Sequence, residues 1–305
     1  MSHVSSAIRW YIVLAVTYLG FAMLLPANKA AVHNYHLSSA GYHSLLLAIL
    51  LPYIGIWFAA FYGAAKLHDY AELIKETPEG LGFTLIAKGF QWLAWGLPVP
   101  ALISLWLNSI ANAHPGFLPS ALIISNYINV VVALVAFHLV GQGTRDLTTL
   151  TKSRLSTTEA RTILLVFLTL GVAFCFFIFR HLNLHSLGST SNPYYLPAWV
   201  LIPTLIIPYL YAWFTGLLAA YEIILYGRHV SGVFYRQALS LLASGMTSVI
   251  ASLIFVQYVR SVAPRAGHLS LNTTLLFINI TFIFMAIGFV LMSFAASKLK
   301  RIEEV

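Results

Sequence analysis

Few side chains in this sequence could do chemistry, and they form no familiar catalytic pattern. The chain has no HExxH motif, no Gly-rich phosphate loop ending in Lys, no GxSxG elbow and no paired aspartates. His181 and His185 have the i, i+4 spacing of a metal-binding helix face, but they fall in a predicted loop or at a helix end, which is weak support for a metal site. We therefore expect no metal and no other cofactor, and the sequence favours a non-enzyme without deciding the question.

The polar residues inside apolar stretches are the better candidates for a site. They are Gln91, Asn126, Asn129, His138, Gln257 and Asn279. Amide side chains in a membrane either hydrogen-bond between helices or line a polar binding cavity, and the sequence leaves both interpretations open. We expect no Asp or Glu deep in any apolar stretch. Because ion-coupled pumps usually depend on such groups, this expectation argues against a proton- or sodium-driven pump.

The elements that carry these residues are long apolar runs. The chain is 59% hydrophobic and only 9% charged, with a mean hydropathy of +0.83, whereas soluble domains are about 25% charged. Stretches of about 20 apolar residues predict membrane-spanning helices. Eight are found, near residues 10–27, 44–65, 84–107, 119–140, 162–180, 197–225, 238–259 and 272–296.

The basic residues indicate the orientation of the chain in the membrane rather than nucleic-acid binding, because they are sparse and lie between the apolar runs. Of the 17 Lys and Arg, only Lys29, Arg180, Arg260 and Arg265 fall on one side of the predicted membrane. The other side carries the rest, and the excess of Lys and Arg marks the cytoplasm. We therefore predict a multi-pass protein of a cell membrane, plasma or bacterial inner, with both termini cytoplasmic.

An internal repeat is the most informative pattern. A shift of 156 residues places Pro52-Tyr53 on Pro208-Tyr209, Trp57-Phe58 on Trp213-Phe214, Tyr70 on Tyr226 and Gly89 on Gly245. A slightly shorter shift places Asn126 on Asn279. The sequence predicts an all-α membrane bundle of eight helices, written as two parallel four-helix repeats at 1–145 and 146–305, with a pseudo-twofold axis along the membrane normal.

The matched prolines and polar residues locate the expected binding site near that axis. Pro52 and Pro208 would bend two helices at equal depth and free backbone carbonyls there; the bends are either static or a pair of hinges. The candidate substrate-binding residues are Pro52, Trp57, Gln91, Asn126, Asn129, Pro208, Trp213 and Asn279.

Lys66 and Glu222 occupy equivalent positions in the two repeats. If the cytoplasmic ends of their helices meet near the axis, the two side chains form an ion pair across it. Otherwise each side chain extends to the membrane surface independently.

Three classes of function are compatible with these patterns. The first is a permease or carrier-like protein that binds a neutral or lipid-like small molecule between the repeats. The second is a sensor, scaffold or accessory subunit that acts through a membrane protein partner. The third, an intramembrane enzyme or redox subunit, is disfavoured because no catalytic constellation is present. The lipid bilayer is the expected environment, and nucleic acid is not an expected partner.

Overall fold

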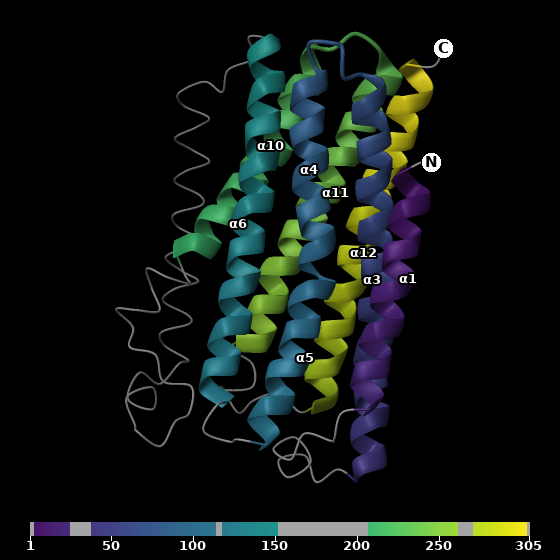
Figure 1. Cartoon of the computed structure of the whole chain (residues 1–305). Helices are drawn as coiled ribbons and strands as arrows, with labels where there is room; N and C mark the ends of the chain where they lie inside the picture. The colour runs from purple at the N-terminus through teal and green to yellow at the C-terminus, as the bar shows by residue number, and fades with distance from the viewer. Residues whose placement is uncertain (1–2, 25–37, 114–117, 152–206, 262–270, 304–305) are drawn as a thin grey trace.

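The computed structural model describes residues 3–24, 38–113, 118–151, 207–261 and 271–303, and these residues are helical with no strand among them. Figure 1 shows them as a bundle of long, roughly aligned helices. The helices are α1 (His3–Leu24), α3 (Ser39–Leu73), α4 (Gly80–Gly96), α5 (Pro98–Ala113), α6 (Leu118–Leu150), α10 (Ile207–His229), α11 (Val233–Ser261) and α12 (Leu271–Glu303).

The structure supports a polytopic membrane protein. Seven helical stretches in the described residues are long and apolar enough to cross a bilayer, with α4 and the first part of α5 counted together. The predicted span at 162–180 lies outside the described residues. The number of eight spans and the full four-plus-four repeat therefore stay predictions.

Several helices extend beyond the predicted spans, because hydropathy marks where a helix leaves the membrane and not where it ends. α3 continues beyond the predicted end at residue 65 to Leu73, and α6 continues beyond residue 140 to Leu150. Parts of the connections expected at 66–79 and 141–161 are therefore helical. Tight backbone hydrogen bonding allows a helix to extend into water as long as its residues have no strong breaker.

Six helices form a closed ring around the core. Each packs against two neighbours, in the order α3, α4, α6, α10, α11, α12 and back to α3. α1 lies outside the ring against α3, with a smaller contact to α5. Figure 1 shows the labels for both chain termini toward the same end of the bundle.

Glycines allow the closest approaches in this ring. A Cβ atom at Gly89 of α4 would lie 2.6 Å from the carbonyl oxygen of Ala136 on α6. A Cβ atom at Gly245 of α11 would lie 2.6 Å from the carbonyl oxygen of Gly288 on α12. Both contacts require a residue without a side chain, as is common where helix backbones meet in lipid.

The third predicted span is interrupted, contrary to the expectation of one helix over 84–107. α4 ends at Gly96 and α5 begins at Pro98. Pro98 and Pro100 have no backbone N–H, so the carbonyls four residues before them, at Ala94 and Gly96, have no helical donor. Leu97 itself keeps helical dihedral angles. Pro52, in contrast, lies inside α3, which continues on both sides of it.

Candidate binding site between α3, α5 and α12

An aromatic cluster surrounds the middle of α3. Trp57 is fully buried and meets the ring of Tyr18 from α1 at 4.8 Å and that of Tyr53 at 5.3 Å, both edge to face. Tyr53 also stacks on Phe282 of α12 at a centroid distance of 5.1 Å. Such pairs add stabilisation beyond the burial of their area, so three helices are joined here by rings.

The hydroxyl of Tyr53 ties α3 to the junction between α4 and α5. It donates a hydrogen bond of 3.0 Å to the carbonyl oxygen of Leu97, the residue between the two helices. Leu97 directly precedes α5, so its carbonyl also accepts the first backbone bond of that helix, and the Tyr53 hydroxyl is a second donor to it. The bond therefore holds α3 against the junction.

Two polar atoms near this cluster are buried without a hydrogen-bond partner: Nε1 of Trp57, a donor, and Oδ1 of Asn279, an acceptor. Asn279 lies on α12 one helical turn before Phe282. A buried polar group with no partner costs about 1–3 kcal/mol, and native structures contain few of them. A molecule carrying an acceptor and a donor would satisfy both atoms.

The other two such atoms belong to histidines. They are Nε2 of His43 and Nδ1 of His68. The His68 ring lies edge to face with that of His3 at 4.1 Å, and Nδ1 of His43 hydrogen-bonds the Ser39 carbonyl. No group of three or more potential metal ligands occurs in the residues that the structure describes, so these histidines do not build a metal centre there.

The repeat-matched residues of α10 have different surroundings. Tyr209 and Trp213 are buried and stack with each other at 5.5 Å and an interplanar angle of 24°, whereas Tyr53 and Trp57 cross at 69°. The helix that corresponds to the α4–α5 segment is α11, which runs without interruption from Val233 to Ser261. Of the two matched tryptophans, Trp57 is the one whose buried indole N–H has no hydrogen-bond partner.

The remaining predicted site residues are scattered. Pro52 is half-buried beside Tyr53, and Pro208 is half-buried in the first turn of the described part of α10. Gln91 is exposed on α4. Asn129 is half-buried and has a partner of its own, while the side chain of Asn126 lies outside the described part. Of the eight predicted residues, Trp57 lies in the aromatic cluster, Pro52 directly precedes Tyr53 on α3, and Asn279 lies three residues before Phe282 on α12.

Glu222, predicted at the cytoplasmic end of its helix, is covered by a neighbouring helix. It is only 5% exposed and accepts a hydrogen bond from the hydroxyl of Thr144 on α6. Its carboxyl group is therefore buried between helices, a property that the expectation about depth in the apolar stretches did not address. α10 continues to His229, and its packing on α6 decides which face of the helix is covered. The sequence of α10 alone therefore does not show that Glu222 is buried.

Lys66 and Glu222 have separate partners in the described residues. The Lys66 ammonium lies 5.5 Å from the centre of the Tyr62 ring, a cation–π distance. Glu222 bonds Thr144, and the Arg145 guanidinium interacts with its charge. An ion pair between Lys66 and Glu222 stays a prediction.

Sequence analysis did not identify a tyrosine cluster at one end of the ring. The hydroxyls of Tyr70 and Tyr235 lie 3.0 Å apart, and the Tyr235 hydroxyl also hydrogen-bonds Tyr226. The Tyr70 ring packs edge to face on Phe83 at 5.0 Å. Tyr70 and Tyr226 are matched in the sequence repeat, and this match is the sequence pattern that could have pointed to the cluster. The cluster links α3, α10 and α11 and fills the space between them.

Comparisons with known proteins provide no assignment. No family model, no curated protein and no solved structure matches this chain.

Proposed function

We propose that this protein is a carrier-like membrane protein that binds a neutral small molecule between α3, α5 and α12. One observation carries the proposal: a buried donor on Trp57 and a buried acceptor on Asn279 have no partner in the protein. The aromatic rings around them favour a ligand that is largely apolar and has one acceptor and one donor.

In this proposal the ligand enters the site where the helix is interrupted at Leu97. Pro98 and Pro100 donate no helical hydrogen bond there, and the Tyr53 hydroxyl ties the Leu97 carbonyl to α3. Elements of low local stability are those that move most readily. In this proposal α5 moves relative to α3 when the ligand enters, while the tyrosine cluster keeps the other end of the ring closed.

An internal duplication supports the placement of the site. The ring order α3-α4-α6 followed by α10-α11-α12 is the order that two parallel copies would produce. The close contacts at Gly89 and Gly245, which are matched in sequence, have equivalent partners on α6 and α12. In this arrangement the cytoplasmic position of both termini still depends on the distribution of Lys and Arg.

A second candidate function is a rigid membrane scaffold or accessory subunit that acts through a partner protein. The tight glycine contacts in both halves of the ring favour it, because close-packed helices resist rearrangement. Under this alternative the unpartnered atoms are isolated defects of packing and no ligand binds them.

Mass spectrometry of co-purifying small molecules separates the two functions. We expect a neutral molecule with the purified wild type and roughly tenfold less of it with Trp57→Phe, which removes the indole N–H but keeps a ring. Trp213→Phe is the matched control in the other half and should retain the molecule. Equal retention by both variants, or no bound molecule in the wild type, would contradict the carrier proposal.

A further inference from the structure

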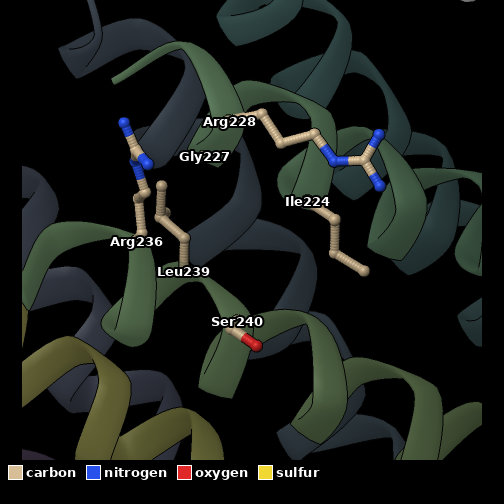
Figure 2. Close-up of a pocket in the computed structure, with 6 residues that line it drawn as sticks. All are labelled: Ile224, Gly227, Arg228, Arg236, Leu239 and Ser240. Carbon is tan, nitrogen blue, oxygen red and sulfur yellow. The ribbon is translucent and has the colours of Figure 1, made fainter. Parts of the chain in front are cut away.

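A pocket of about 210 Å³ lies where α10 ends and α11 begins, away from the site just described. Figure 2 shows the six residues that line it: Ile224, Gly227, Arg228, Arg236, Leu239 and Ser240. Two cations, one hydroxyl and an apolar floor therefore meet in one hollow.

The turn between the helices positions one of these cations. Gly232 has φ +112°, a left-handed backbone conformation that favours glycine, and its carbonyl oxygen accepts the N–H of Arg236 at 3.2 Å. Nε of Arg236 donates to the Val230 carbonyl at 3.1 Å. The guanidinium is thereby held at the mouth of the pocket, and its two terminal nitrogens are not used by that bond.

No acidic group neutralises the pocket from its own helices. Between Glu222 and Glu303 the sequence contains neither Asp nor Glu, and the Glu222 carboxylate faces Thr144 on α6. Arg228 and Arg236 are both exposed, and Figure 2 shows their guanidinium groups on opposite sides of the pocket. From other elements, Glu79 and Glu303 act on the neighbouring Tyr226 and Tyr235, and neither glutamate lines the pocket. The separation of the two guanidinium groups suits an extended anionic group rather than one small ion.

The position of the pocket along the bundle favours a lipid as the anion. The apolar spans end at His229 and resume at Val233, so the pocket lies at a predicted membrane boundary. Val233 and Phe234, next to it, are 67% and 73% exposed, which suits side chains that enter the lipid interface. An anion that brings its own apolar chains fits these surroundings better than a soluble one.

We propose that the α10–α11 pocket binds the headgroup of an anionic phospholipid. The headgroup extends from Arg228 to Arg236 with Ser240 as a further donor, and the acyl chains run along the exposed Ile224. Basic pockets at the ends of membrane helices bind anionic lipids by this combination of charge and apolar contact. The inference does not depend on the proposed carrier function.

The first half of the chain lacks this chemistry. The shift of 156 residues that aligns the repeat places Arg228 on Glu72 and Arg236 on Gly80. The corresponding region carries a negative charge and no guanidinium pair. We therefore place the proposed headgroup site on the second half, because the matching positions of the first half lack the two arginines.

Native mass spectrometry with added phosphatidylglycerol or phosphatidylcholine tests the proposal on the full chain in detergent. We expect the wild type to retain phosphatidylglycerol preferentially, and Arg228→Gln with Arg236→Gln to weaken this binding roughly fivefold for each arginine removed. Lys75→Gln with Lys298→Gln removes two exposed charges elsewhere and should leave binding as it is. Thermal unfolding of each variant verifies that it is folded.

Three results would overturn the proposal. One is equal retention of phosphatidylglycerol by the wild type and the double arginine variant. Another is an equal loss in the lysine control pair, which would show an effect of net charge alone. The third is full competition by inorganic phosphate, which would identify a soluble phosphate as the ligand instead of a lipid.

Discussion

α3 and α10 carry the same Pro-Tyr and Trp-Phe pairs at the same spacing but have different neighbours. Beside α3, the α4–α5 segment is interrupted by prolines, and the Tyr53 hydroxyl bonds the Leu97 carbonyl. Beside α10, α11 is continuous, because the positions matching Pro98 and Pro100 are Ile254 and Val256. The shared residues give the two halves similar packing, and the unshared prolines interrupt a helix in one half.

The matched glycine contacts test whether the two halves share their packing. Gly89→Val and Gly245→Val should each lower the free energy of unfolding by about 3 kcal/mol, since the added carbons overlap a backbone carbonyl on the next helix. Gly55→Val is the control, because a Cβ atom there meets nothing within 4 Å. Apparent unfolding temperatures in detergent provide the measurement. A mild effect at only one of the two glycines would show that the halves pack differently.

The matched pair Lys66 and Glu222 should behave differently in a double-mutant cycle. Thr144→Val and Glu222→Gln should be coupled by about 1.5 kcal/mol, because a charge-assisted hydrogen bond joins the two residues. Lys66→Met with Glu222→Gln should show no coupling, since the Lys66 ammonium lies over Tyr62. Coupling in the second cycle would establish the cross-repeat ion pair.

The Tyr53 hydroxyl and the two prolines act on different carbonyls of the α4–α5 junction. Tyr53→Phe should cost about 1 kcal/mol, because it removes the hydrogen bond from the hydroxyl to the Leu97 carbonyl. Pro98→Ala with Pro100→Ala restores the N–H groups that the carbonyls of Ala94 and Gly96 lack, so the two changes should be additive. Unfolding temperatures of the wild type, the two variants and their combination measure this. A cost of Tyr53→Phe that changes in the alanine background would contradict the separation.

The smallest effect is expected at Trp57 in the absence of ligand. Trp57→Phe removes a buried N–H that bonds nothing, so the loss of packing is offset by relief of an unsatisfied donor, and stability should change by less than about 1 kcal/mol. Trp213→Phe, where the side chain has a further interaction, should cost more. Unfolding temperatures of the two ligand-free variants measure the difference. A larger loss of stability in Trp57→Phe than in Trp213→Phe would contradict this prediction.

Much of the fold was predictable because a bilayer imposes strong constraints on sequence. Every backbone polar group in lipid must be bonded within the chain, so long apolar runs form helices. Seven of the predicted spans correspond to such helices in the described residues. The helix ends were less predictable, as α3 and α6 show, because hydropathy does not record where a helix stops in water.

The candidate site was predictable only in part. Pro52 and Trp57 drew attention through the repeat, and Asn279 through its polarity in an apolar run. The roles of Tyr53 and Leu97 depended on a contact between residues 44 positions apart. The burial of Glu222 depended on α6, 78 positions away in sequence. Pattern analysis of single helices cannot detect such contacts.

The sequence by itself determined that this chain is a membrane-spanning helical protein, because its low charge and long apolar runs exclude a water-soluble fold. Its prolines at 98 and 100 also encoded the break of one helix. Only the tertiary structure decided which helices are neighbours, which polar atoms are left without partners and where two arginines flank one pocket. These properties arise from the rotation and depth at which helices pack, which side chains on several helices determine together.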